Sequence, residues 1–312
     1  MTQASGAATG AAAAATTAAA RSFSLRLVFD VFKLRIGLTI AFTALAGLAV
    51  APGHWPGAWQ ACARLVSVTL ASAAAGAYNQ LFERDLDRRM TRTEDRAFVT
   101  GRLRAGPTWI AIILATGACG IGLAAIVLNG RSAICTLAGA LTYGLVYTRW
   151  LKRRTRWNIV IGGLAGSFAV LAGAAVVDAQ HWAPVTIWLA IVLFLWTPPH
   201  FWSLAIAFHD DYRAAGVPML PVVVGDARSA RAVFAGTVLL VASALVPAFL
   251  GLGLLYAVCA LIAGAYLLVR SGQLLRFPDR PHAMTNFGAS LVYLAALLAA
   301  AIGDAAVRAA LA

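Results

Sequence analysis

Residues 108–128, TWIAIILATGACGIGLAAIVL, form an apolar run without a single charged side chain. A helix needs about 20 mostly apolar residues to cross the hydrocarbon core of a bilayer, so this run predicts a membrane-spanning helix. Similar runs lie near residues 34–52, 61–82, 132–150, 157–178, 185–208, 230–250, 252–270 and 284–304. The sequence therefore predicts an all-α membrane protein with about nine transmembrane helices.

The composition of the whole chain supports this fold class. Of 312 residues, 61% are hydrophobic and only 12% are charged, whereas soluble domains carry about a quarter of charged residues. The first residues are mostly Ala, Thr and Gly and have no periodic apolar face. We expect a disordered tail over residues 1–22 and a single transmembrane domain over residues 23–312.

The basic residues are distributed unevenly between the two sides of such a membrane protein. With nine spans, 22 of the 25 Lys and Arg residues lie on the side that holds the N-terminus. Positive residues remain on the cytoplasmic side, so a multi-pass protein of the inner (cytoplasmic) membrane with a cytoplasmic N-terminus is predicted. The net charge of +13 then reflects topology and contact with membrane lipid. No basic soluble face is evident, which argues against a nucleic-acid partner.

The stretch NQLFERDLDRRMTRTEDR, residues 79–96, follows the second apolar run and holds five carboxylates and five arginines. Asn79, Glu83 and Asp87 are spaced four residues apart. If the helix continues past the membrane edge, the three side chains share one face. One amide and two carboxylates suit Mg²⁺, which shares its coordination with water and a substrate phosphate. The alternative is that these are ordinary solvated charges of a cytoplasmic loop.

Two further polar stretches are expected at the same boundary. FHDDYRAAGVPMLP, residues 208–221, contains Asp210 and Asp211, and YTRWLKRRTRWN, residues 147–158, contains Lys152 and Arg153. Two acidic stretches with a basic one between them would hold Mg²⁺ and a diphosphate. The basic stretch alone could equally be a patch that binds lipid headgroups. A diphosphate site beside an apolar cavity favours cleavage of an allylic C–O bond, with the leaving diphosphate stabilised by metal and cations.

These stretches, together with WTPPHFWSLAI, resemble the UbiA-type membrane prenyltransferases over nearly all of residues 30–300. Within that family they are most similar to the protoheme IX farnesyltransferases, also called heme O synthases. The chain departs from the family pattern at Glu83, where the first motif usually has Asp, and at Leu34, where a proline is usual.

The resemblance implies nine helices around a central cavity. It also implies transfer of farnesyl from farnesyl diphosphate to the vinyl group of heme B, followed by addition of water to give heme O. Heme A synthase or terminal oxidase assembly would provide the partner proteins. By motif, the Mg²⁺ ligands and catalytic residues would be Asn79, Glu83, Asp87, Asp210 and Asp211. The residues that would bind diphosphate are Arg88, Tyr147, Lys152, Arg153 and Asn158.

Heme B as a substrate calls for a contact to the porphyrin or its iron. His200 follows WTPP inside an apolar run, where two prolines are expected to break or kink the helix. A polar residue at that depth must face a cavity or a partner. His200 is therefore the first candidate for a heme contact and His282 the second. The alternative is a hydrogen-bonded histidine with a structural role.

Three other functions are compatible with parts of the pattern. A UbiA-type enzyme could prenylate a quinone precursor or another lipid acceptor. A polytopic transporter is less favoured, because the carboxylates gather at the membrane edge and none is evident at the midplane. An assembly factor that merely carries heme would not need the acidic stretches.

Overall fold

The computed structural model describes residues 25–311, so the predicted tail over residues 1–22 lies outside it. Within that part of the chain there are helices and no strands. The first half comprises α2 (Leu25–Val31), α3 (Leu34–Val50), α4 (Ala58–Phe82), α5 (Arg84–Asp87), α6 (Pro107–Leu123), the π-helical η1 (Ala124–Leu128), α7 (Gly130–Leu141) and the π-helical η2 (Thr142–Leu151). The second comprises α8 (Asn158–Gly162), α9 (Leu164–Ala174), α10 (Pro184–Ala207), α11 (His209–Ala214), α12 (Leu220–Val224), α13 (Asp226–Phe249), α14 (Leu254–Arg276) and α15 (Arg280–Leu311).

The prediction of an all-α membrane protein is confirmed, but the count of nine spans is not. Within the described residues, six helices are long and apolar enough to cross a bilayer, and a seventh span results if α2 and α3, bent by 58°, count as one. Each of the nine predicted runs overlaps a helix or a pair of consecutive helices. The pair α8–α9 is shorter than the full spans.

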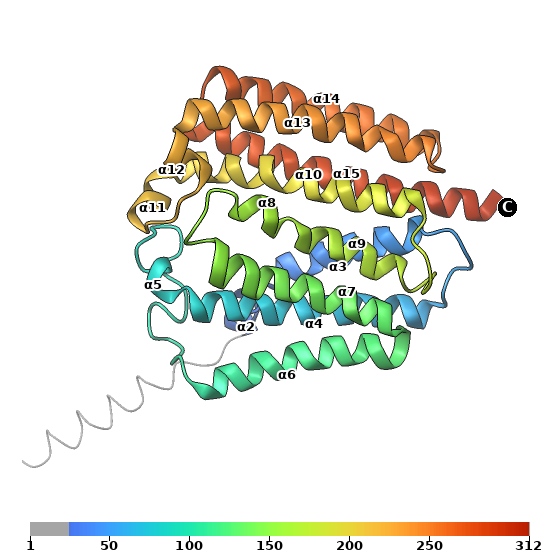
Figure 1. Ribbon diagram of the computed structural model, residues 1–312, viewed down its shortest axis with the longest axis horizontal. Coiled ribbons are helices and arrows are strands. Elements are labelled where there is room, and N and C mark those ends of the chain that lie inside the picture. The colour runs from blue at the N-terminus through green and yellow to red at the C-terminus, as the bar shows by residue number, and fades with distance from the viewer. Residues whose placement is uncertain (1–24, 312) are drawn as a thin grey trace, which may run out of the picture.

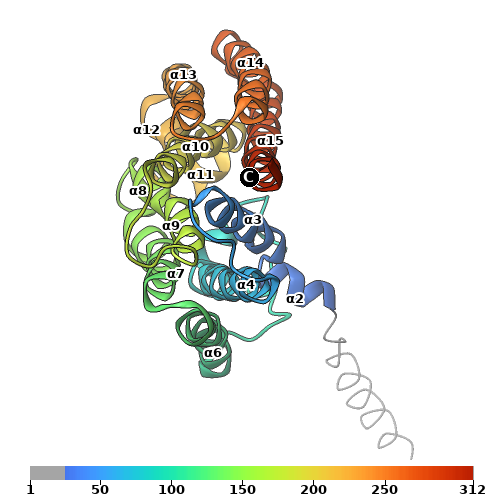
Figure 2. The ribbon, with the colours of Figure 1, turned by 90° about the vertical axis from the view of Figure 1, so that its right-hand side faces the viewer.

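The long helices run side by side in two groups (Figure 1). One group consists of α4, α6, α7 and α9, and the other of α10, α13, α14 and α15. Seen along the helices, α3 lies between the groups (Figure 2), in contact with α4, α9 and α15. The two groups are thus joined through α3, and they also meet directly where α9 contacts α10. We call the end with α5, α11 and α12 the site end.

The contact between α3 and α9 depends on two glycines. A Cβ atom on Gly47 would lie 2.1 Å from the backbone oxygen of Val170, and one on Gly173 would lie 1.8 Å from that of Ala44. Each glycine thus admits the backbone of the other helix. Between membrane helices, close packing of small residues replaces the hydrophobic drive that operates in water.

We therefore expect Gly173→Val to destabilise the protein strongly. The added side chain meets backbone, which cannot rotate away as a side chain could, and overpacking of this kind costs about 1–3 kcal/mol or more. The variant should show a lower unfolding temperature in detergent than Gly166→Val, because a Cβ on Gly166 comes no closer than 4.0 Å to a neighbour. Equal stability of the two variants would contradict the close-contact argument.

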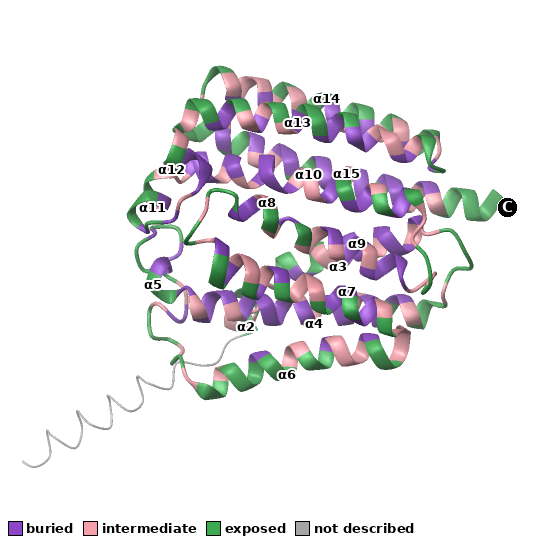
Figure 3. Cartoon of the chain, viewed as in Figure 1, coloured by how far each residue is buried: buried purple, intermediate pink, exposed green. Residues whose placement is uncertain are grey.

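The outer faces of the bundle are exposed (Figure 3), and many of the exposed side chains are large and apolar. Only 17% of the most apolar stretch of α6–η1 is buried, and side chains such as Ile110, Leu114 and Ile126 point outward. Exposed apolar residues over this length would be unfavourable in water. They match a helix surrounded by lipid tails.

Arg64 of α4 is fully buried and binds neighbouring helices through hydroxyl and carbonyl oxygens rather than a carboxylate. Its guanidinium donates to Thr136 Oγ1 at 2.6 Å, to Ser67 Oγ at 3.2 Å and to Ser132 Oγ. These bonds join α4 to α7, and a longer one reaches the backbone of Ala172 in α9. Arg64 thus holds three helices together.

Candidate functional site

A cavity of about 830 Å³ lies between α3, α4, the α7–η2 helix, α8, α9, α10 and α15. Much of one wall is Gly and Ala, contributed by residues 71, 75, 76, 139, 140, 162, 163, 165, 166, 169 and 172. Another wall carries the rings of Trp196, His200 and Phe287. At the site end the lining becomes polar and charged. The cavity therefore joins an apolar compartment to an ionic one.

Asn79, Glu83 and Asp87 share one face at the ionic end, as their spacing predicts. Backbone hydrogen bonds link them along the helix path: Glu83 N donates to Asn79 O at 2.9 Å, and Asp87 N to Glu83 O at 2.8 Å. Helical bonding thus continues across the break between α4 and α5. All three residues line the cavity, and none is more than 3% exposed.

Each of these three side chains is bound by a basic residue. Lys33 Nζ lies 2.6 Å from Asn79 Oδ1, Lys152 Nζ lies 2.5 Å from Glu83 Oε2, and one Arg96 nitrogen lies 2.7 Å from Asp87 Oδ2. Lys33, Lys152 and Arg96 also line the cavity. Burying two carboxylates is costly unless they are paired and hydrogen-bonded, which explains why the cations converge on them.

The protonation of Lys152 follows from the same pairing. Burial alone would lower the pKa of its ammonium group, but the negative charge of Glu83 and their hydrogen bond outweigh this and raise the pKa above its ordinary value. Lys152 therefore remains a cation at neutral pH.

The face formed by Asn79, Glu83 and Asp87, which we call the acidic stripe, offers oxygen ligands suited to a hard cation. Glu83 Oε1 is buried and has no hydrogen-bond partner in the described chain. Such an unpaired buried oxygen is expensive unless something binds it. Carboxylate and amide oxygens are ligands that Mg²⁺ accepts, so the donor set fits this ion. Among the described residues, however, no group of three or more His, Cys, Asp or Glu side chains is assembled for metal binding.

The position of Lys33 depends on a sharp bend between α2 and α3. Its backbone has φ 48°, in the left-handed region that residues other than glycine seldom adopt. A Cβ on Gly76 would come 3.3 Å from the Lys33 side chain, so α4 leaves room for the lysine to pass. The bend directs Nζ to Asn79 and, at 3.2 Å, to the hydroxyl of Tyr143.

Tyr143 and Tyr147 come from the π-helical segment η2. Their rings stack with centroids 5.8 Å apart, and both line the cavity. The ammonium groups of Lys33 and Lys152 lie 5.8 Å from the Tyr143 and Tyr147 rings, respectively. π-helical segments are frequent at functional sites, and here the ten-residue η2 brings two aromatic faces to the ionic end.

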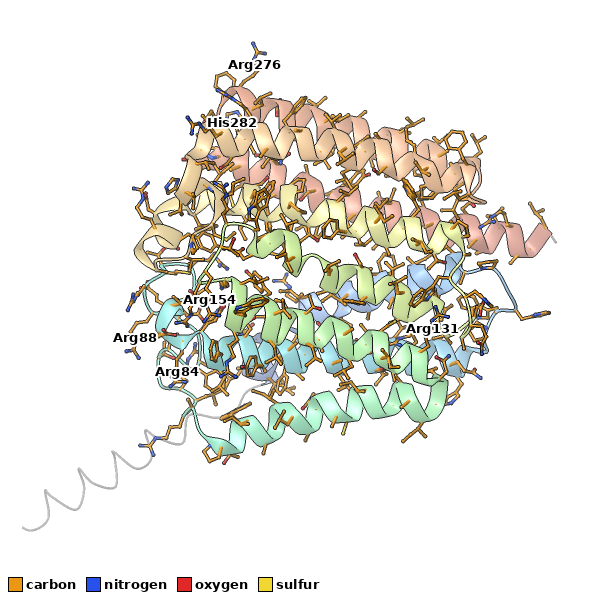
Figure 4. The ribbon with its side chains drawn as sticks, viewed as in Figure 1. Arg84, Arg88, Arg131, Arg154, Arg276 and His282 are labelled. Atoms are coloured by element: carbon orange, nitrogen blue, oxygen red, sulfur yellow. The ribbon has the colours of Figure 1, made fainter. Side chains whose placement is uncertain are left out.

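Three other predicted diphosphate contacts lie outside the cavity lining. Arg153 binds the exposed Asp85 through two hydrogen bonds of 2.9 and 3.0 Å. Partial burial favours a higher pKa for Asp85, but the bonds and charge of Arg153 lower it below its ordinary value. Arg88, which follows α5, is exposed and is directed away from the bundle (Figure 4). Asn158 is fully buried, and its amide donates to Thr155 O at 2.6 Å.

The structure does not bring Asp210 and Asp211 together with the first acidic stripe. Asp210 has a side chain that is 94% exposed and lies 3.5 Å from Arg213. Asp211 accepts from Thr91 Oγ1 at 2.9 Å and from the backbone N–H of Arg92 at 3.2 Å. Neither is among the cavity-lining residues of the described chain. The chain turns at Phe208, between α10 and α11, and carries both carboxylates away from the cavity.

The two candidate histidines differ in their surroundings. His200 is buried, lines the cavity and stacks between Trp196 and Phe287, with ring centroids 4.2 and 4.3 Å away. Its Nδ1 lies 2.6 Å from Ser290 Oγ. His282 instead lies at the outer edge of the site end (Figure 4), where it binds Asp279.

Of the predicted break or kink at Pro198 and Pro199, the break is wrong, since α10 is helical from Pro184 to Ala207. Thr197 Oγ1 donates to Leu193 O at 3.0 Å, and Ser203 Oγ donates to Pro199 O at 2.7 Å. These hydroxyls add hydrogen bonds near the prolines, whereas the carbonyls that lose an N–H partner are those of Phe194 and Leu195, four positions before the prolines.

Lys33 and Arg96 were not among the predicted site residues. In the sequence they are two of 25 basic residues. Lys33 binds the amide oxygen of Asn79, which is 46 positions away in the sequence. Arg96 binds the carboxylate of Asp87, which is 9 positions away. Only the placement of Arg96 shortly after Asp87 could have suggested a pair.

Comparisons with known proteins agree with this architecture. The sequence profile described as the UbiA prenyltransferase family matches residues 40–297. The chain is 51% identical to Protoheme IX farnesyltransferase 2 of Paramagnetospirillum magneticum over 277 residues, which cover 89% of this chain and 96% of that protein. It is 46% identical to Protoheme IX farnesyltransferase 1 of the same organism, covering 90% and 99% of the two chains.

Solved structures share the fold at low sequence identity. A digeranylgeranylglyceryl phosphate synthase superposes with a TM-score of 0.71 at 18% identity, over 90% of this chain and 98% of that one. A UbiA homolog from Archaeoglobus fulgidus bound to DMAPP and Mg²⁺ gives a TM-score of 0.70 at 18% identity, over 88% and 99%. With the profile match and the close relatives, these findings show that the chain belongs to the UbiA prenyltransferase family.

Proposed function

We propose that the protein transfers a farnesyl group from farnesyl diphosphate to the vinyl group of heme B, giving heme O. The acceptor and donor are those of the named relatives. The observation that carries the chemistry is the set of three oxygen-bearing side chains, each paired with a cation, at the ionic end of a largely apolar cavity. A transporter or a heme carrier has no use for this arrangement.

The ionic end would bind the diphosphate. Asn79, Glu83 and Asp87 would hold Mg²⁺, which when bound supplies positive charge to the leaving diphosphate. Lys33, Lys152 and Arg96 would turn from these side chains to the diphosphate oxygens, so that each charge remains paired throughout. Once turned to the diphosphate, these buried basic side chains would stabilise the developing negative charge without reorganising solvent.

The cavity would then bind the prenyl chain and stabilise the allylic cation. When the C–O bond breaks, the electron pair leaves with the diphosphate. The faces of Tyr143 and Tyr147 stabilise positive charge on the prenyl carbon. The Gly and Ala wall leaves room for the farnesyl chain, which would keep water from the allylic carbon until the new C–C bond has formed. The heme vinyl carbon forms the new C–C bond, and a water molecule adds to the resulting cation and releases a proton.

His200 would contact the porphyrin. It lies in the aromatic wall of the cavity, and Ser290 Oγ donates to Phe287 O at 2.7 Å. Because that bond uses the only serine hydroxyl proton, His200 Nδ1 must itself donate to Ser290. The lone pair then resides on Nε2, which has no hydrogen-bond partner in the described chain. An unprotonated imidazole nitrogen is a suitable ligand for heme iron.

The orientation in the membrane is part of the same proposal. Arg84, Arg88, Arg154 and Arg276 lie at the site end, whereas Arg131 lies at the other end (Figure 4). By the positive-inside rule the site end faces the cytoplasm of an inner membrane, and so does the N-terminus. Heme A synthase or a terminal oxidase under assembly would receive the product.

The test is a reaction in detergent with purified protein, farnesyl diphosphate, heme B and Mg²⁺. We expect heme O by chromatography and mass spectrometry, with one diphosphate released for each heme consumed and neither product after chelation of the metal. Replacement of heme B by 4-hydroxybenzoate separates the two enzyme classes. Prenylation of that acceptor, with heme B unchanged, would overturn the heme assignment.

For His200→Phe we expect a selective loss of heme affinity. The substituted ring retains the stack with Trp196 and Phe287 but has no nitrogen lone pair. The KM for heme B should rise at least tenfold, while the KM for farnesyl diphosphate stays within twofold of the parent value. Steady-state kinetics with each substrate varied in turn measures both. An equal rise in the two KM values would instead indicate a structural histidine.

A further inference from the structure

The lining of the cavity stops along each helix before the end that lies opposite the site end. Counted from the site end, the last lining residues are Thr43 of α3, Val68 of α4, Cys135 of α7, Ala172 of α9 and Leu193 of α10. We call these residues, together with the lining residue Thr136, the cavity floor. Asn79 and Val68 are 11 positions apart on α4, which is about 16 Å at a rise of about 1.5 Å per residue. The apolar compartment therefore has a defined depth.

Arg64 lies one turn of α4 beyond the floor residue Val68 and does not itself line the cavity. It is fully buried. Its guanidinium donates to Thr136 Oγ1 at 2.6 Å and to the backbone oxygen of Ala172 at 3.4 Å, so two floor residues contact it directly. Its other partners are serine hydroxyls, and no carboxylate of residues 25–311 pairs with it. A cation surrounded by neutral oxygens thus lies directly behind the floor.

The hydrogen bonds of Arg64 make this floor difficult to displace. Thr136 Oγ1 accepts from Arg64 and donates to Ser132 O at 2.8 Å, while Ser132 Oγ accepts from Arg64 and donates to Ala172 O at 2.8 Å. Moving Thr136 or Ala172 aside would leave N–H groups of a buried cation without acceptors, which is costly in an apolar interior. A floor of flexible apolar side chains could repack around a longer ligand, whereas this one must first break these bonds.

The depth of the floor matches the length of a farnesyl chain. An extended farnesyl chain whose allylic carbon lies beside Asn79 and Tyr143 reaches the level of Val68. One further isoprene unit adds about one helical turn, which is the separation of Val68 from Arg64 along α4. A longer chain would therefore have to push the floor toward the guanidinium. A chain that is one unit shorter would leave the deep end unfilled and would bury less apolar surface.

We propose that the cavity floor, fixed from behind by Arg64, sets the length of the prenyl chain that the protein accepts. A farnesyl chain fits, and a geranylgeranyl chain is rejected. This inference rests on the proposed function for the identity of the donor and for the placement of its chain beside the Gly and Ala wall. It gives Arg64 a role in substrate selection in addition to its role in joining three helices.

The first variant, Val68→Phe, raises the floor. Its ring would fill the last turn of the lining on α4, so that farnesyl should no longer fit, whereas geranyl should still fit. Ala75→Phe is the matched control, because Ala75 lines the cavity two turns nearer to Asn79. A ring at that position should shorten the compartment for both donors alike.

The second variant, Arg64→Met, removes the barrier behind the floor and leaves every lining residue in place. Ser132 and Thr136 keep the backbone carbonyls to which they donate, so neither hydroxyl loses its acceptor. Asn129→Ala is the matched control. It removes a different hydrogen bond between the start of α7 and the end of α9, from Asn129 Nδ2 to Ala175 O at 2.7 Å, at a position outside the lining.

Donor binding is measured without heme, in detergent and with Mg²⁺. The probes are the thiolodiphosphate analogues of the geranyl, farnesyl and geranylgeranyl donors, in which sulfur replaces the oxygen of the allylic bond. Titration calorimetry gives each Kd, corrected for partitioning of the probe into protein-free micelles. We expect the parent to bind the farnesyl analogue more tightly than the geranylgeranyl analogue by about tenfold or more, as for a pocket too small for additional methylenes.

The variants should change this preference in a defined way. Arg64→Met should bring the Kd values of the farnesyl and geranylgeranyl analogues to within about threefold of each other, and Asn129→Ala should keep the parental ratio even if its unfolding temperature falls. Val68→Phe should weaken the farnesyl analogue by about tenfold or more and leave the geranyl analogue within about twofold of the parent. Ala75→Phe should weaken both of these analogues by similar factors.

Equal affinity of the parent for the farnesyl and geranylgeranyl analogues would overturn the proposal. A parental ratio in Arg64→Met would also overturn it, because Arg64 would then be purely structural. If that variant does not fold, parental farnesyl affinity in Val68→Phe overturns the proposal instead. A parent that shows the length preference but transfers no farnesyl group to heme B would refute the proposed function alone.

Discussion

Asp87→Asn is expected to reduce turnover by about 10²- to 10³-fold, the loss typical of removing one preorganised electrostatic contact from an active site. The side chain keeps its shape, and its amide oxygen can still accept from Arg96, which lies 2.7 Å away. The substitution removes one negative charge from the stripe that would hold Mg²⁺. Farnesyl diphosphate should therefore bind with a higher Mg²⁺ requirement, measured as the metal concentration that gives half-maximal diphosphate release.

Asp85→Asn provides the control for this prediction. Asp85 is two positions away, exposed and paired with Arg153 outside the cavity lining of the described residues. Its neutralisation should change turnover by less than about twofold, as expected for a screened surface ion pair. Parental turnover and Mg²⁺ requirement in Asp87→Asn would show that the stripe does not hold the metal.

The acidic stripe could be predicted because it depends on local periodicity. Side chains four residues apart share a helix face wherever helical hydrogen bonding continues, and the bonds from Glu83 to Asn79 and from Asp87 to Glu83 show that it does. The apolar runs likewise predict helices, and each run overlaps one or two of them; only six or seven of the described helices are long and apolar enough to cross a bilayer, so run length alone overestimates the number of spans. Neither inference needs knowledge of the tertiary structure.

The partners of the stripe could not be predicted in this way. Lys33 meets Asn79 across 46 positions, and Lys152 meets Glu83 across 69. The position of the Lys33 side chain also depends on a left-handed backbone conformation, and no glycine at this position indicates that conformation in the sequence. The basic stretch around Lys152 was recognised as a unit, but its members face different directions: Lys152 enters the cavity and Arg153 remains at the surface.

The second acidic stretch shows a related limit. The end of an apolar run fixes the depth of Asp210 and Asp211 in the membrane, but not the direction in which the chain leaves the helix. At Phe208 the backbone departs from helical geometry, with φ −119° and ψ 36°, and α11 starts in a new direction. Position at a common boundary is therefore weaker evidence for a shared site than periodicity within one helix.

Replacing Lys152 should lower both the stability of the protein and its farnesyl transfer, and a second substitution can separate the two effects. In Lys152→Met, Glu83 would remain buried, with a side chain only 1% exposed, and would lose the ammonium group now 2.5 Å away. Removing one partner of a buried ion pair costs about 3–5 kcal/mol. We expect a markedly lower unfolding temperature in detergent and loss of nearly all farnesyl transfer.

The double variant Lys152→Met/Glu83→Met distinguishes the two effects. It leaves no charge at either position, and replacement of a buried ion pair by hydrophobic residues of similar volume is often neutral for stability. The unfolding temperature should return close to that of the parent, whereas transfer should remain abolished, because both a metal ligand and a diphosphate cation are missing. A double variant as unstable as Lys152→Met would show that the ion pair is not the origin of the instability.

The pH dependence of the stability difference provides an independent check. Because the folded state raises the pKa of Lys152, the pair contributes its full stabilisation below the unfolded lysine value of about 10.4 and loses it only as the pH rises through the still higher folded value. The difference in unfolding free energy between the parent and Lys152→Met should therefore not decrease between about pH 7 and pH 9. A difference that already shrinks in this range would mean that Lys152 loses its proton early and is not held by Glu83.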